Sequence, residues 1–144
     1  MAEHKAIVKQ VQGITFIGKT DDTNSWVTMD GPDTFGGSNA AIRPKELLLL
    51  SLAGCTGADV VAILQKKRVK LDGFHVNVSA ESTETHPKVY SKINLEYVFT
   101  GKNIREKDVE RAIQLSQEIY CGVTAMLQKA VEITHNYKIV IPED

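Results

Sequence analysis

The hydrophobic and polar positions of the first 41 residues follow the pattern of short strands and turns. Brief apolar runs alternate with polar residues, and glycine or polar clusters interrupt them. The pattern predicts strands at residues 6–11, 14–18 and 26–29. The stretch 30–41 is rich in glycine and also contains a proline, so we expect it to be a loop that leads straight into a helix.

A long helix is predicted from Pro44 to Lys67. Proline suits the first helical turn, because its missing N–H group would have no partner there in any case. Between Leu47 and Leu64 the apolar residues occupy nearly every direction around the axis, and a helix that is apolar all round has to be enclosed by protein. At roughly 24 residues and about 36 Å, it is long for so small a domain to enclose. We therefore expect a second copy of the chain to cover part of it.

The rest of the chain predicts a hairpin, two helices and a last strand. Two alternating segments, 74–83 and 89–99, each bury one face as strands, and the turn between them lies at 84–88. Apolar residues at helical spacing predict helices at 104–118 and 121–130, followed by a strand at 131–141. This order indicates a single α+β domain over residues 1–144, since strands and helices do not alternate as βα units.

Composition and charge narrow the possible classes of protein. Of the 144 residues 42% are hydrophobic and 24% are charged, which is typical of a soluble globular domain. Lys and Arg number 17 and Asp and Glu 18, so no excess of positive charge favours nucleic acid or anionic lipid. The N-terminus lacks a secretory signal, and the longest apolar run is far shorter than the roughly 20 residues of a membrane span. We expect a cytoplasmic protein with neither a nucleic-acid nor a membrane partner.

The two cysteines, Cys55 and Cys121, are the candidate reactive groups. In a reducing compartment cysteines are more often free thiols than structural disulfides, so a bond between them would be transient. Two cysteines cannot complete a four-ligand zinc site, and the four histidines show no metal-ligand spacing to help them. We expect no metal and no cofactor.

Cys55 lies in the middle of the long helix, between Gly54 and Gly57. Each glycine costs about 1 kcal/mol relative to alanine in a helix interior, and the pair leaves the sulfur without neighbouring side chains. That pattern fits the approach of a substrate, and it also fits a close-packed neighbouring helix around a cysteine that only fills space. Asp59, one turn later, would raise the pKa of the thiol if it faced the sulfur, and we expect it to bond a backbone group or a lysine instead.

Cys121 lies at the predicted start of the third helix, where a helix N-terminus favours the nucleophilic thiolate. Sequence spacing does not tell whether the two sulfurs meet, because a disulfide needs Cα atoms about 4.4 to 6.8 Å apart in space.

Three segments carry a resemblance to a known family. They are Arg43-Pro44-Lys45-Glu46-Leu47, Leu52-Ala53-Gly54-Cys55-Thr56 and Tyr120-Cys121-Gly122-Val123. In these segments, and in the order of its elements over essentially the whole chain, the protein resembles osmotically inducible protein C and the organic hydroperoxide resistance proteins, the OsmC/Ohr family. The resemblance implies an OsmC-like α+β fold. In that fold a long, buried central helix is wrapped by antiparallel β-sheet in an intertwined homodimer.

The resemblance also implies a cysteine-based peroxidase that acts on organic hydroperoxides. By analogy, Cys55 attacks the peroxide oxygen and becomes a sulfenic acid, and Cys121 condenses with it to form a disulfide. Thiol reductants, which in some family members are lipoyl-bearing proteins, restore the dithiol.

The residues that activate the thiolate depart from the family pattern. Family members use an arginine from the N-terminal strands and a glutamate directly after the helix-start proline. Here no arginine precedes Arg43, and Lys45 follows the proline. The nearest substitutes are Arg43 and Glu46, with Lys19 as a weaker candidate. Along a straight helix Arg43 and Glu46 lie about 18 Å and about 13.5 Å from Cys55, so they would have to act from a partner subunit. Alternatively, they form an exposed ion pair.

Two other functions are compatible with the sequence. A protein of this fold could bind a small molecule in an apolar dimer cleft and keep its cysteines only as packing, which Lys45 in place of the glutamate favours. It could also be a redox sensor that forms the same disulfide slowly.

Overall fold

The computed structural model describes residues 1–144. They form two compact units, Met1–Leu48 and Leu49–Asp144. Each unit contains one three-stranded sheet. The single domain expected over residues 1–144 stays a prediction.

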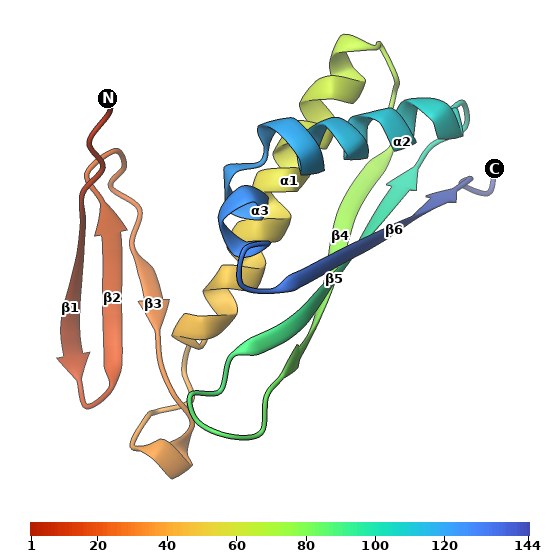
Figure 1. Ribbon diagram of the computed structural model, residues 1–144. Helices are drawn as coiled ribbons and strands as arrows, with labels where there is room; N and C mark the ends of the chain where they lie inside the picture. Colours follow the sequence, from red (N-terminus) through yellow and green to blue (C-terminus); the bar gives the residue numbers. More distant parts are fainter. The chain divides into compact units, whose positions relative to one another are not determined.

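The first unit is an antiparallel meander, as its sequence pattern predicts. Its strands are β1 (Ala6–Gln12), β2 (Thr15–Thr20) and β3 (Val27–Met29), in that order across the sheet (Figure 1). The turn between β1 and β2 contains Gly13 at φ +55°, in the left-handed region that favours glycine.

One carboxylate organises the loop that follows β3. Asp30 is buried, and it accepts backbone hydrogen bonds from Gly31, Ser38 and Ala40. Burial by itself raises the pKa of Asp30, but these N–H groups outweigh it and hold the pKa below its usual value. The loop also contains a short 3₁₀ turn, Asp33–Phe35, which the sequence pattern did not predict.

The predicted long helix is confirmed as a 3₁₀ turn, Pro44–Glu46, that runs directly into α1 (Leu47–Lys66). The remaining elements are β4 (Gly73–Ser82), β5 (Tyr90–Thr100), α2 (Glu106–Leu115), α3 (Gly122–Leu127) and β6 (Glu132–Val140). A π-helical turn, Ser116–Tyr120, separates α2 from α3. The predicted second helix therefore changes its hydrogen-bonding pattern at residue 116.

The second sheet differs from expectation in the direction of its last strand. β4 and β5 form the predicted antiparallel hairpin, but β6 pairs with β5 in parallel, from Lys92↔Glu132 to Thr100↔Val140. The expectation of a sheet that is antiparallel throughout is wrong for this pair. The physical reason is the connection: the helices between the two strands carry the chain back to the end where β5 began, and a strand that starts there runs parallel.

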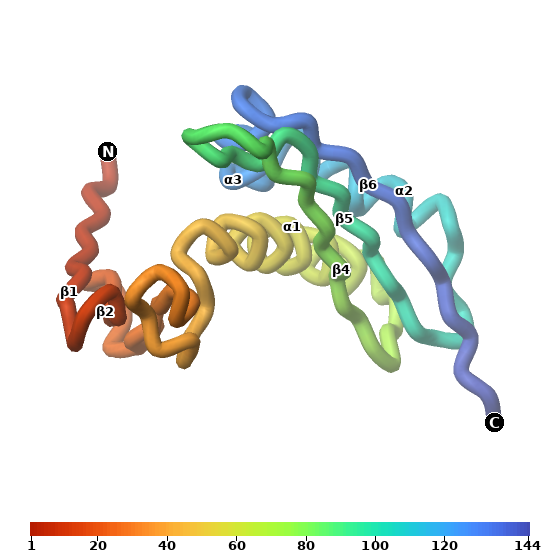
Figure 2. Tube along the Cα trace, turned by 90° about the horizontal axis from the view of Figure 1, so that it is seen from below, coloured from red at the N-terminus to blue at the C-terminus, as the bar shows by residue number.

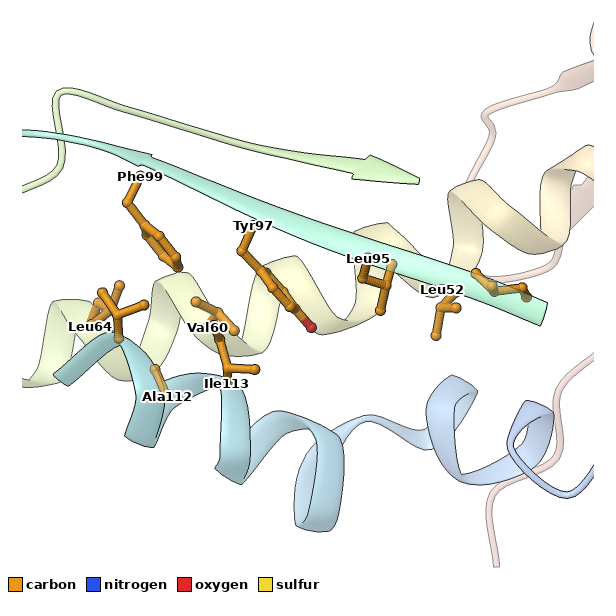
Figure 3. Packing of buried hydrophobic residues seen from close by; sticks show 10 residues of the cluster. Leu52, Val60, Leu64, Leu95, Tyr97, Phe99, Ala112 and Ile113 are labelled. Atoms are coloured by element: carbon orange, nitrogen blue, oxygen red, sulfur yellow. The ribbon is translucent and has the colours of Figure 1, made fainter. Parts of the chain in front are cut away.

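The apolar face of β5 forms the centre of the core in this unit. Ile93, Leu95, Tyr97 and Phe99 alternate along the strand and are at most 1% exposed. They pack against residues of α1 and α2, including Val60 and Ile113 (Figure 3). The period of two in the sequence reflects this single buried face.

The chain by itself covers one face of α1. Leu52, Thr56, Val60 and Leu64, spaced by four residues, are fully buried, and α1 lies along the β4–β5–β6 sheet on this side (Figure 2). Elsewhere on the helix Leu50 is 53% exposed.

Pro44–Lys66 is long and apolar enough to cross a membrane by length and composition, with a mean hydropathy of 2.1, although core helices of soluble proteins meet the same criterion. Of the 18-residue window that meets this criterion, 28% is buried within the chain, and Leu48 and Leu50 are 45% and 53% exposed.

Candidate functional site

The fold brings Cys55 and Cys121 together. Both are free thiols; Cys55 is partly exposed on α1, and Cys121 is 3% exposed just before α3. The Cys121 thiol lies near enough to Cys55 to raise the pKa of the Cys55 thiol. Sequence spacing left open whether the two cysteines meet, and in the structure they are neighbours within one chain.

The first turn of α3 donates backbone hydrogen bonds to both sulfurs. Cys121 is the N-cap of α3, and its Sγ accepts the N–H of Thr124 at 3.4 Å. The N–H of Val123 hydrogen-bonds to the Cys55 thiol. The first N–H groups of a helix have no partner within the helix, and here two of them point at sulfur. This confirms the prediction that Cys121 lies at the start of the third helix.

The surroundings of Cys55 act on its pKa in opposite directions. Burial raises the pKa of the thiol above its usual value of 9.0. The Val123 hydrogen bond lowers it, whereas the neighbouring Cys121 and the charge of Asp59 raise it further. The net shift is upward, so the described chain by itself does not favour the thiolate at neutral pH.

A cluster of polar side chains lies beside the dithiol. The Thr56 hydroxyl, adjacent in sequence to Cys55, lies 2.7 Å from Tyr97 Oη and 2.7 Å from Ser116 Oγ. The amide of Gln117 donates to Thr56 Oγ1 at 3.1 Å and to Tyr97 Oη at 2.8 Å. Ser116 in turn donates to a carboxylate oxygen of Asp59 at 2.9 Å. Asp59 was expected to bond a backbone group or a lysine, and that expectation is wrong.

The sequence analysis singled out Asp59 but did not predict that it lies in a cluster with Thr56, Tyr97, Ser116 and Gln117. The available signal was Thr56 itself, a hydroxyl that falls on the same helical face as Leu52 and Val60 and must find a partner when buried. Tyr97 is fully buried as well. Burial raises the pKa of Tyr97, while the hydrogen bonds that it makes with Thr56 and Gln117 lower it. The net shift is upward, which keeps the phenol neutral.

The two glycines next to Cys55 have different surroundings. A Cβ on Gly57 would lie 3.4 Å from the ring of Phe74, so this glycine faces the β4 strand. A Cβ on Gly54 would meet nothing within 4 Å. Together with Ala53, Ala58 and Val76, they line a shallow apolar groove on the surface of α1 and β4. Packing explains Gly57, whereas Gly54 faces open space.

Arg43 and Glu46 make hydrogen bonds within their own segment. The Arg43 backbone N–H donates to Glu46 Oε2 at 3.4 Å, and its guanidinium donates to the Ala41 carbonyl at 3.1 Å and to the Asn39 side chain. The alternative of an ion pair between their side chains is therefore wrong: Glu46 caps the backbone at the helix start.

Lys19, the weaker candidate for activating the thiolate, lies over the ring of Trp26, with Nζ 5.4 Å from its centroid.

Among the described residues no group of three or more His, Cys, Asp or Glu could hold a metal ion.

A larger groove of about 640 Å³ lies between α2, α3 and β6. Gln117 and Thr124 line it, together with His135, Tyr137 and Glu110. Thr124 Oγ1 is buried without a hydrogen-bond partner.

Comparisons of the chain with family models, with other proteins and with solved structures point to the same family. A family model for OsmC-like protein matches residues 36–136. Protein YhfA of Escherichia coli strain K12 is 39% identical over 136 residues, which cover 94% of this chain and 98% of that protein. The crystal structure of a hypothetical protein from Aquifex aeolicus VF5 is 31% identical with a TM-score of 0.85, covering 99% of this chain and 100% of the other.

A more distant structure shares the fold. An organic hydroperoxide resistance protein OsmC from Legionella pneumophila is 14% identical with a TM-score of 0.71, and the similarity covers 96% of this chain and 98% of that protein. The family match and the relatives confirm the predicted α+β, OsmC-like fold. This chain belongs to the OsmC-like protein family.

Proposed function

We propose that the protein is a thiol-dependent peroxidase that reduces organic hydroperoxides, with Cys55 as the attacking thiol and Cys121 as the resolving thiol. The observation that carries the proposal is that the two free thiols are neighbours within one chain, close enough for Cys121 to raise the pKa of Cys55. Membership of the OsmC-like family supports a redox role for this pair.

The proposed reaction balances in two steps. The Cys55 thiolate attacks one peroxide oxygen, the O–O bond breaks, and the departing alkoxide takes up a proton to leave as an alcohol. The resulting Cys55 sulfenic acid reacts with Cys121, which forms the S–S bond and releases water. A dithiol reductant, lipoyl-bearing or otherwise, then gives two electrons and two protons to restore both thiols. We propose that this cycle runs in the cytoplasm.

The partly exposed position of Cys55 suits this assignment of roles. A peroxide has to reach the attacking sulfur, and Gly54 leaves space beside it. Cys121 is buried and is reached most readily by its neighbour. The apolar groove next to Gly54 would suit the alkyl group of an organic hydroperoxide.

We further propose that the active form is a homodimer. Leu48 and Leu50 on the long helix are 45% and 53% exposed, and a second copy is the occupant that the sequence predicts. The raised pKa of Cys55 calls for a nearby cation, and Arg43 of a second copy, held by Glu46, is the proposed source. Light scattering coupled to size exclusion should give twice the mass of 15.9 kDa, and a monomer at micromolar concentration would contradict the proposal.

Thiol counting tests the peroxidase. The reduced protein is mixed with one equivalent of an organic hydroperoxide, and free thiols are titrated over time. Loss of both thiols within seconds supports the proposal. The Cys121→Ser variant should trap a sulfenic acid on Cys55, whereas Cys55→Ser should react no faster than a free thiol. A sulfenic acid trapped on Cys121 would reverse the roles.

A slow redox sensor is the second candidate, favoured by the raised pKa of Cys55. In the same experiment it would lose both thiols over minutes to hours and would not turn over with added reductant. No loss of thiols would leave only the small-molecule-binding protein.

A further inference from the structure

The polar cluster beside the dithiol connects the two cysteines through very few atoms. Thr56 directly follows Cys55, and its hydroxyl lies 2.7 Å from Ser116 Oγ. The carbonyl of Ser116 accepts the backbone N–H of Cys121 at 2.8 Å, which is the hydrogen bond that closes the π-helical turn. Two hydrogen bonds therefore link the residue after Cys55 to Cys121 itself.

The directions of the hydrogen bonds follow from counting hydrogens. The Asp59 carboxylate can only accept, so Ser116 gives its single hydrogen to Asp59 and must accept from Thr56. Thr56 has then used its hydrogen, so Tyr97 must donate to it. The amide of Gln117 supplies its two hydrogens to Thr56 and Tyr97.

In this arrangement the Thr56 oxygen makes the one donation and two acceptances that a hydroxyl allows, and the Ser116 hydrogen goes to Asp59 at 2.9 Å rather than to the Thr56 carbonyl at 3.5 Å. Thr56 and Ser116 are both fully buried, so water cannot easily replace a lost partner. A saturated, buried network of this kind has a single arrangement and holds its members rigidly. Ser116 is also the first residue of the π-helical turn before Cys121, and such turns occur frequently at functional sites.

We propose that Thr56 is a positioning residue for the dithiol. Its hydroxyl fixes the π-helical turn to α1, and this keeps Cys121 within bonding range of Cys55. The role in turnover rests on the proposed function, but the effect on the cysteine pair does not. Holding two reacting groups in place raises their effective concentration, so the network should favour the intramolecular disulfide over mixed disulfides with small thiols.

The equilibrium between dithiol and disulfide tests the proposal without any peroxide. The protein is equilibrated in glutathione redox buffers, and the fraction with the Cys55–Cys121 bond is measured by alkylation and mass spectrometry. Thr56→Val removes the central hydroxyl at nearly constant volume, and Ser116→Ala removes the link to the π-helical turn. Each should lower the equilibrium constant by about tenfold or more and raise the share of mixed disulfide.

Two matched variants control for general loss of stability. Thr56→Ser keeps the hydroxyl and should restore the wild-type equilibrium constant. Thr134→Val removes a hydroxyl on β6 that donates to Asn94 on β5. This variant should leave the equilibrium constant for the Cys55–Cys121 disulfide unchanged. Far-UV circular dichroism shows which variants are folded. If Thr56→Val does not fold, the equilibrium constant of Ser116→Ala tests the positioning role instead.

The outcomes separate this proposal from the proposed function. Folded Thr56→Val or Ser116→Ala protein with the wild-type equilibrium constant overturns the positioning role, whatever the peroxide kinetics. A wild-type protein that forms the intramolecular disulfide but ignores hydroperoxides overturns the peroxidase and leaves the positioning role supported. A wild-type protein that forms no intramolecular disulfide overturns both.

Discussion

The sulfur of Cys55 receives one backbone hydrogen bond and faces one carboxylate. The N–H of Val123 stabilises the thiolate, and the negative charge of Asp59 destabilises it. Asp59 is also the final acceptor of the hydrogen bonds that pass through Ser116. The same carboxylate thus anchors the cluster and makes Cys55 harder to ionise.

Replacing Asp59 with asparagine should lower the pKa of Cys55. Asparagine still accepts the Ser116 hydrogen but carries no charge, so one of the causes that raise the pKa disappears. In a Cys121→Ser background, the rate of alkylation by iodoacetamide against pH should reach half its maximum at a lower pH in Asp59→Asn than in the parent. Asp72→Asn, beyond the far end of α1, serves as the control. An unchanged midpoint in Asp59→Asn would contradict the influence of this charge.

Prediction from sequence at the residue scale succeeded where the signal is local. The position of Cys121 at a helix start follows from its neighbours in the chain, and the structure confirms it. The cluster of Thr56 with Tyr97 and Ser116 joins residues 41 and 60 positions apart. Local pattern contains no information on such pairs, because only the packing of α1 against β5 and α2 brings them together.

At the scale of elements, a buried carboxylate fastens α2 to the end of α1. Asp108 is 2% exposed. Its carboxylate accepts hydrogen bonds from Arg105 Nε at 2.8 Å and from Lys67 Nζ at 3.3 Å. The hydrogen bond from Arg105 is the main cause that holds the pKa of Asp108 below 3.8; burial opposes it, and Lys67 adds to it. The two helices are therefore joined by charge as well as by apolar contacts.

Asp108→Asn should lower the thermal unfolding midpoint at neutral pH. A carboxyl group with a lowered folded-state pKa stabilises the fold above its unfolded-state pKa, and this contribution is lost as the pH falls through the folded-state value. The difference in unfolding midpoint between the variant and the wild type should be largest at pH 6 to 7 and should shrink below pH 3.8. Asp144→Asn, which removes an exposed ion pair with Lys102, should leave the midpoint unchanged. A difference for Asp108→Asn that persists unchanged at low pH would argue against the ion pairs.

Most elements were predictable because hydrophobic period and turn residues are local properties. The strands of the first sheet, the β4–β5 hairpin and α1 lie within a few residues of their predicted bounds. The direction of β6 was not predictable from its own residues, since a strand has the same alternation in either direction. The π-helical turn was missed as well: its first residue, Ser116, makes a hydrogen bond with Thr56, which is 60 positions away in the sequence.

At the scale of the whole molecule, the chain has one tryptophan, and it lies in the first unit. Trp26 is 43% exposed, with Lys9 Nζ 5.9 Å and Lys19 Nζ 5.4 Å from its ring centroid. Nearly all of the α-helical residues belong to the second unit. Tryptophan fluorescence and the helical circular dichroism signal therefore report on different units.

The two signals test the prediction of a single domain. If residues 1–144 unfold as one cooperative domain, Trp26 fluorescence and ellipticity at 222 nm should change at the same urea concentration. Trp26→Phe confirms that the fluorescence change comes from this residue. A fluorescence transition at clearly lower urea would mean that the first unit unfolds by itself.

The order of the two cysteines along the chain has a consequence for newly made protein. Cys121 lies in the connection between β5 and β6, whereas Cys55 precedes both of them. A ribosome releases Cys55 long before the connection and its last strand exist. The nascent polypeptide therefore carries a solitary sulfhydryl, open to capping by glutathione or to overoxidation, until translation is almost complete.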